Sequence, residues 1–209
     1  MVKKFLQPLV VVGMCVMMTG CFGGAGIDTK IDPKIMENKE EVQKLYDAIL
    51  DRMGDQATKA HEITITVSNP EDKGNKGDAY LMILADMQNP SNSKKLQRCM
   101  FHGEIGGWQS AQEVTVDVRG SDKEKADFRL EDELFDFKNQ INAEKLHKII
   151  LDAYEKDNKE PEKYTYRYVY SVGISITGIT VDVKGKLAAN DQIIDDRYYF
   201  DLDGNPLHD

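Results

Sequence analysis

The sequence predicts an α+β domain in which helices pack on one face of an antiparallel β-sheet. Two segments, 34–53 and 143–156, repeat apolar residues at helical spacing, so each presents one apolar stripe. Each is followed by short stretches in which apolar and polar residues alternate, as they do in half-buried strands. The connections between these stretches are too short for parallel crossovers, so we expect antiparallel strands.

The first helix is expected over 34–53. Asp32 and Pro33 offer a cap and a first-turn proline, and Gly54 is a stop signal. The apolar stripe consists of Val42, Leu45, Tyr46, Ile49, Leu50 and Met53. This spacing places all six side chains on one side of a helix.

Four strands are expected after this helix, and a charged segment follows them. The strands are predicted over 61–68, 78–87, 96–102 and 112–119. Segment 120–140 is less regular, but its phenylalanines and leucines indicate that it still packs against the domain.

The second helix, 143–156, is followed by three expected strands, with Gly178 as a candidate bulge. These strands are predicted over 164–171, 175–184 and 192–202. The order of elements suggests two tandem halves, 34–140 and 141–209, each a helix followed by a meander. Only the element order supports this duplication, because the sequence alone shows no convincing residue identity between the halves.

The N-terminus has the layout of a secretory signal peptide. Lys3 and Lys4 precede an apolar run that is short for a transmembrane helix. Met18-Thr19-Gly20-Cys21 then resembles the lipobox of bacterial lipoproteins, in which an apolar and two small residues precede a cysteine. The resemblance implies cleavage after residue 20 and lipidation, including palmitate, on Cys21. The alternative is an ordinary secretory signal in which this cysteine has no role.

These features predict a signal peptide over 1–20, a lipidated flexible tether over 21–33 and a globular domain over 34–209. Two or three acyl chains would hold the domain stably at a membrane of the cell envelope. The residue after the cysteine is Phe22 and not aspartate, which by the enterobacterial sorting pattern favours the outer membrane if the host has two membranes.

The chain is acidic, with a formal net charge of −9. Cleavage would remove two lysines and no acidic residue, so the mature charge would be −11. Such a chain repels phosphates, and we expect no nucleic-acid partner. Cys99 would be the one cysteine left without lipid, so no intramolecular disulfide is expected, and its apolar strand predicts a buried, unreactive thiol.

We predict no metal, no cofactor and no catalytic residue. Asp201-Leu-Asp-Gly-Asn205 resembles part of a calcium loop, but the chain ends at Asp209, before the other ligands could follow, so a turn is the better interpretation. The four histidines have no zinc-ligand spacing, and the chain lacks G-x-S-x-G, P-loop and Rossmann glycine patterns.

Tyrosines provide the best functional lead. Tyr164, Tyr166, Tyr168 and Tyr170 alternate along one predicted strand, so they would share one face. Exposed, they would form a binding surface, whereas a covering helix would make them core. Trp108, after two glycines, is either a core residue or an exposed anchor.

The C-terminal strand and its Asp-Gly-Asn turn weakly resemble the last hairpin of PepSY-type and β-lactamase-inhibitor-like modules. That resemblance implies a small binding or inhibitory domain of the cell envelope. We therefore expect a membrane-tethered, non-enzymatic binding or assembly module with a protein or envelope partner. The alternatives are an inhibitor of a secreted or periplasmic enzyme, and a hydrolase that uses a carboxylate pair from 127–136.

Overall fold

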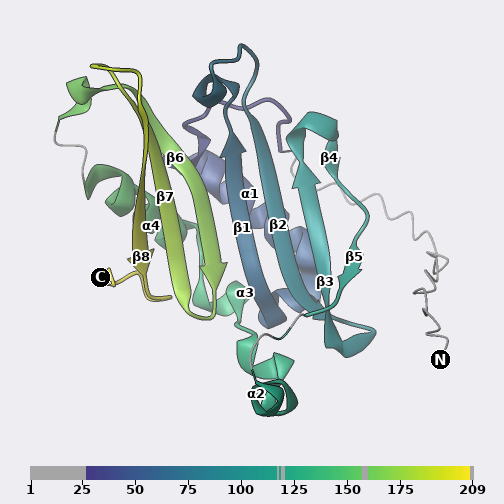
Figure 1. The fold of residues 1–209 in the computed structure, drawn as a ribbon. Coiled ribbons are helices and arrows are strands. Elements are labelled where there is room, and N and C mark those ends of the chain that lie inside the picture. Colours follow the sequence, from purple (N-terminus) through teal and green to yellow (C-terminus); the bar gives the residue numbers. More distant parts are fainter. Residues whose placement is uncertain (1–26, 117, 119–120, 157–159, 208–209) are drawn as a thin grey trace, which may run out of the picture.

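The computed structural model describes residues 27–207, apart from 117, 119–120 and 157–159. Over these residues the chain forms one antiparallel sheet of eight strands. Its two long helices, α1 and α4, lie behind the sheet in Figure 1, on the same face. The expected α+β class with helices on one face is confirmed.

Helix α1 (Lys39–Met53) begins later than expected. A 3-10 turn, η1 (Ile35–Glu37), precedes it, and Asn38 caps the helix by accepting the backbone N–H of Glu41 at 3.1 Å. Asp32 lies in the turn before η1, where it accepts the N–H of Lys34 instead of capping the helix.

The tether, expected to reach residue 33, is already attached to the domain at Ile31. The N–H of Ile31 donates to the carbonyl of Ala79 at 3.0 Å, and Lys30 forms an ion pair with Asp78. Ile27 and Ile31 also pack against the core on the helix side of the sheet.

The first meander follows the expected order, with one difference at its end. It consists of η2 (Gly54–Lys59), β1 (Ala60–Ser68), η3 (Pro70–Lys73), β2 (Tyr80–Asn89) and β3 (Asn92–His102). Instead of one strand over 112–119, two short pieces pair with β3, namely β4 (Gly107–Trp108) and β5 (Gln112–Val114), with η4 (Gly103–Ile105) before them. Positions 117 and 119 of that predicted strand lie outside the described residues.

The second half begins after a short helical region at the lower end of the sheet in Figure 1. That region contains α2 (Asp122–Asp127), η5 (Leu130–Glu133) and α3 (Phe137–Gln140). Helix α4 (Ala143–Lys156) then leads through η6 (Pro161–Lys163) to β6 (Tyr164–Ser175), β7 (Gly178–Leu187) and β8 (Ile193–Phe200).

The strand order is β4-β3-β2-β1-β6-β7-β8, with β5 also on β3. The first strands of the two meanders, β1 and β6, therefore pair antiparallel at the centre of the sheet. Helices α1 and α4 contact each other across the same centre. The core lies between the helices and the sheet and includes Ile49, Ile63, Leu146 and Val172.

The pairing register relates the two halves by an approximate two-fold axis through the central pair Thr64 and Gly173. The axis superposes β1 on β6, β2 on β7 and β3 on β8. Two residues are equivalent when they lie the same number of positions along these strands from the central pair. Identical residues then coincide at five positions of the paired strands: Ile65 with Ile174, Ile83 with Ile179, Asp86 with Asp182, Arg98 with Arg197, and Phe101 with Phe200. The halves thus share buried and surface residues as well as the order of their elements.

Candidate functional site

The sheet face opposite α1 and α4 carries neither long helix, and we call it the open face (Figure 1). Because side chains alternate across a strand, the neighbours of buried Ile63, Ile65 and Val67 point to this face. Its half-buried residues are Thr64, Thr66, Ser68, Tyr80, Met82, Leu84, Met100, His102, Ser171, Gly173 and Thr180. Short hydroxyl side chains thus lie beside an apolar group of methionine and leucine.

One end of the open face is covered. Leu96 of β3 and Leu130 of η5 are both buried but do not belong to the main core, and η5 contacts β3. The segment around η5 therefore shields the lower end of β3, and the exposed area extends from there toward Tyr80 and His102, whose rings stack at 5.4 Å.

Two arginine–aspartate pairs lie on the open face, one in each half. Arg98 donates from Nε and Nη2 to the two carboxylate oxygens of Asp86, at 2.8 and 2.7 Å. Arg197 donates from the same two atoms to Asp182, at 2.5 and 3.0 Å. Each pair joins neighbouring strands, and the fork geometry fixes both charges.

The carboxylate of Asp72, 12% exposed, links the segment between β1 and β2 to the second half. Asp72 of η3 accepts the hydroxyls of Tyr166 and Tyr168 at 2.8 and 2.5 Å, and Lys184 lies 3.2 Å away. The ammonium of Lys184 also sits 3.7 Å from the ring centroid of Tyr170. Burial, followed by the bond to Asp72, raises the pKa of Tyr168 far above its ordinary value.

The four tyrosines do not form one exposed row. Register shifts after Tyr164 and after Val169 break the alternation of β6. Tyr164 contacts Arg167 and lies against Gly185 on the helix side, whereas Tyr166 and Tyr168 bind Asp72. Tyr168 is only 1% exposed, so it belongs to the interior, covered by η3 and not by a long helix.

Trp108 packs on the helix side, at the edge strand β4. Its ring meets Phe101 edge-on at 5.6 Å, and the guanidinium of Arg52 from α1 lies 5.6 Å from the ring centroid. The side chain is partly buried against the core. Of the two interpretations that the sequence left open, the geometry fits a core residue.

A polar group lies on the helix side between η1, α4 and β6. Arg167, 4% exposed, donates to the carbonyl of Tyr154 at 2.5 Å and stacks between the rings of Tyr154 and Tyr164. The ring of His147 donates to the carbonyl of Glu37 at 3.1 Å. Burial raises the pKa of the Glu37 carboxyl to about 7.

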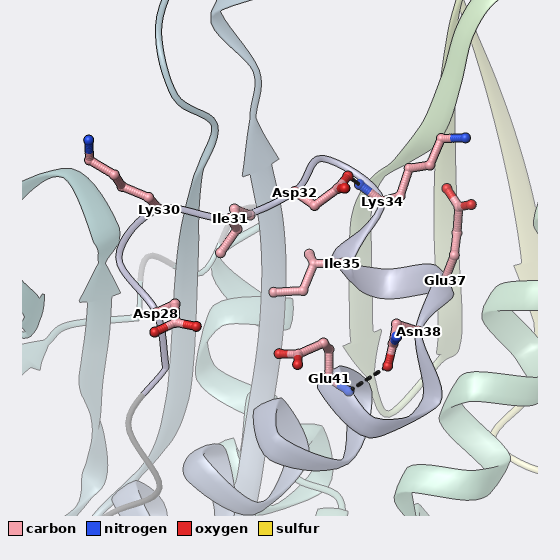
Figure 2. Close-up of a pocket in the computed structure, with 9 residues that line it drawn as sticks. All are labelled: Asp28, Lys30, Ile31, Asp32, Lys34, Ile35, Glu37, Asn38 and Glu41. Atoms are coloured by element: carbon pink, nitrogen blue, oxygen red, sulfur yellow. Dashed lines mark hydrogen bonds between the residues drawn. The ribbon is translucent and has the colours of Figure 1, made fainter.

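Glu37 also lines a hollow of about 470 Å³ where the N-terminal segment meets the domain (Figure 2). Asp28, Asp32, Glu37 and Glu41 surround it, together with lysines and isoleucines. In Figure 2 Lys30 extends away from the hollow, while Ile35 points toward its middle. Two of its acidic groups already have partners, because Asp32 accepts the backbone N–H of Lys34 and Glu41 accepts the ammonium of Lys44. One carboxylate oxygen of Glu37, by contrast, is buried and has no hydrogen-bond partner among the described residues.

A smaller hollow, of about 250 Å³, opens on the open face between the ends of β1, β6, β7 and β8. Side chains that line it are Glu62, Ser175, Thr177, Thr180, Tyr199 and Leu207, and Gly173 also lines it, with the hydroxyl of Thr180 lying close to where a Cβ would otherwise be. A pattern of alternating residues could not reveal this site, because it depends on strands that lie far apart in the sequence.

Other sequence candidates have structural roles. Cys99 is buried, and burial raises its thiol pKa. Asp201 accepts the N–H groups of Asp203 and Asn205, which confirms the predicted turn. Asp136, from the carboxylate-rich stretch, caps α3 by accepting the N–H of Asn139 at 3.0 Å.

Cys21 lies outside the described residues. None of the helices within residues 27–207, as far as they are described, is long and apolar enough to cross a membrane. The same residues contain no group of three or more histidine, cysteine or acidic side chains that could hold a metal ion. Comparison of the chain with protein-family models, curated proteins and solved structures finds no match to any of them.

Proposed function

We propose that the protein is a membrane-tethered lipoprotein of the cell envelope that binds a protein partner through the open face, without catalysing a reaction. The observation that carries this proposal is the composition of that face. Met82, Leu84 and Met100 are half-buried there without a helix over them, next to a row of threonines and serines. Apolar patches bordered by polar groups are typical of protein interfaces.

The attachment of the N-terminal segment supports the same proposal. Five residues lie between Cys21 and Ile27, and the six residue steps from one to the other span at most about 22 Å. Ile27 and Ile31 pack on the helix side of the sheet. A lipid on Cys21 would therefore hold the domain close to the membrane by its helix side and leave the open face accessible.

The test uses a photo-crosslinking amino acid at single positions in living cells. Thr64 and Met100 are the open-face positions, and exposed Gln43 on α1 is the matched control. We expect one protein adduct from the two open-face positions and none from α1. Adducts from α1 alone, or none from any position, would refute the open face as the binding surface.

A Cys21→Ala variant tests the anchor separately. We expect it to move from the membrane fraction to the soluble fraction while the purified domain keeps its unfolding free energy. An unchanged distribution would refute lipidation at this residue.

Inhibition of a secreted or periplasmic enzyme is one form that such binding could take. Tyr168 cannot take part in it, because the side chain is buried, so contacts would have to come from the threonines and methionines. Identification of the crosslinked partner as an enzyme, with loss of its activity on binding, would favour this form. Turnover by the purified domain, lost on substitution of a carboxylate within 127–136, would favour a hydrolase instead.

A further inference from the structure

We infer that the 250 Å³ hollow on the open face receives a lysine or arginine side chain of the protein partner. This inference rests on the proposed function and names the chemistry that the open face would recognise. Its evidence is independent of the apolar group around Leu84, because neither Leu84 nor the two methionines line the hollow, and Glu62 is its one lining residue from the first half.

Two residues beside the hollow differ from those at the equivalent positions of the first half. The two-fold relation pairs Gly173 with Thr64 and Thr180 with Leu84. The first half thus places larger side chains where the second half has a glycine and a threonine. The halves share three core residues and their arginine–aspartate pairs, and they differ at these two positions beside the hollow.

The walls of the hollow suit the stem of a long side chain. Tyr199 and Leu207 are 39% and 46% exposed, and both line it. The hydroxyls of Ser175 and Thr177, 2.8 Å apart, lie at the β6–β7 turn. A volume of 250 Å³ is below the roughly 300–1,000 Å³ of sites for whole small molecules, so one side chain is the fitting occupant.

The charge of the hollow selects a basic occupant. Glu62 is exposed and forms no hydrogen bond or ion pair with any residue that the structure describes. Arg98 acts on Glu62 electrostatically, but its guanidinium is bound to both carboxylate oxygens of Asp86, and Arg197 is bound to Asp182. Glu62 therefore contributes a negative charge that is only partly balanced, by an arginine it shares with Asp86, and the net charge of −9 adds a long-range attraction for cations.

In the occupied site, the methylene stem would contact Tyr199 and Leu207, and the ammonium or guanidinium would reach Glu62. The hydroxyls of Ser175 and Thr177 would accept its remaining N–H groups. A saccharide could use the tyrosine and the hydroxyls, but it would leave the free carboxylate without a partner of opposite charge. The exposed carboxylate thus favours a basic side chain over a sugar.

The test is an NMR titration of the purified domain with Nα-acetyl-lysine methylamide and Nα-acetyl-arginine methylamide. We expect saturable shifts of the backbone N–H signals of Gly173, Thr177 and Thr180, with a Kd in the millimolar range. Glu62→Gln should weaken binding by up to about fivefold, which is the contribution of an exposed ion pair. Gly173→Thr, which restores the first-half residue, should abolish it, and exposed Glu40→Gln is the control.

Three results would overturn the inference: no shift at these signals, equal binding of the uncharged Nα-acetyl-norleucine methylamide, or unchanged affinity in Glu62→Gln. Preferential binding of N-acetylglucosamine would overturn it in favour of a saccharide. The titration is independent of the crosslinking experiment. Crosslinks at Met100 together with a negative titration would reject the basic side chain and leave the proposed function standing.

Discussion

Asp86 on β2 and Asp182 on β7 occupy equivalent positions in the two halves of the sheet, and each binds an arginine on the next strand in the same two-bond geometry. Their surroundings differ, because the side chain of Asp86 is 7% exposed and that of Asp182 is 15% exposed. Arg98 is also better shielded than Arg197, at 39% against 59%. The repeat therefore provides one interaction in two environments.

Substitution of each aspartate by asparagine should separate the effect of burial from that of geometry. We expect Asp86→Asn to lower the free energy of unfolding by about 2 kcal/mol, because it leaves a shielded arginine without its counter-charge, and Asp182→Asn to lower it by about 1 kcal/mol or less. Urea unfolding of both variants measures the difference. A larger loss for Asp182→Asn would mean that burial does not set the cost of breaking these pairs.

Tyr168→Phe should destabilise the domain by about 1–2 kcal/mol, since it removes a buried hydroxyl that Asp72 accepts. Asp72→Ala should cost more, because two tyrosine hydroxyls and Lys184 would lose their common partner. Thermal and urea unfolding measure both. Tyr164→Phe is the control, because no hydrogen bond joins Tyr164 to Asp72 among the described residues. If Tyr164→Phe lowered the free energy of unfolding as much as Tyr168→Phe, the role assigned to the Tyr168 hydroxyl would be wrong.

Helical spacing and strand alternation predict both long helices, six of the strands and the position where a seventh, β5, begins, whereas the two-residue strand β4 was not predicted. These signals are local, since the stripe containing Val42 and Ile49 and the alternation of Ile63 and Ile65 each depend on residues a few positions apart. The start of the first helix differs from the prediction, because Asp32 and Pro33 form a helix-start signal ahead of the residue that caps the helix. The structure uses Asn38.

The arrangement of the open face depends on pairing across the sheet, which no local pattern contains. A register shift between Tyr164 and Tyr166 moves Tyr164 away from the face of Tyr166 and Tyr168, and a second shift follows Val169. Asp72, in a polar connection, binds residues more than ninety positions later. Each half contains the short patterns Ile-x-x-Asp and Arg-x-x-Phe on neighbouring strands. Such patterns are too short to be recognised as a repeat in the sequence, and only the strand register shows that they occupy equivalent positions.

Gly178→Ala should destabilise the domain by about 3 kcal/mol or more. The backbone at Gly178 has φ +131°, and an added Cβ would lie 2.2 Å from the carbonyl oxygen of Phe200. The strained backbone angle and the collision with Phe200 can be relieved only if β7 shifts relative to β8. Gly74→Ala is the control, with φ +70° and no atom within 4 Å, and should cost about 1 kcal/mol. Equal losses in urea unfolding would show that the close approach to Phe200 carries no cost.

Glu37→Gln should remove a pH dependence of stability. Burial raises the pKa of the Glu37 carboxyl from its ordinary 4.5 to about 7. Between these values the folded chain keeps a proton that the unfolded chain has lost. The contribution of Glu37 to stability is therefore fully present below about pH 4.5, falls as the pH rises, and is lost above about pH 7.

The measurement is the free energy of unfolding in urea from pH 4.5 to 8 for the original protein and for Glu37→Gln. We expect the difference between them to change steadily across this range in favour of glutamine at high pH, because the amide stays neutral beside Tyr154 and Arg167. Exposed Glu40→Gln serves as the matched control and should not reproduce this change. A difference that is constant with pH would show that Glu37 is ionised throughout, and that the contacts of η1 with α4 accommodate its charge.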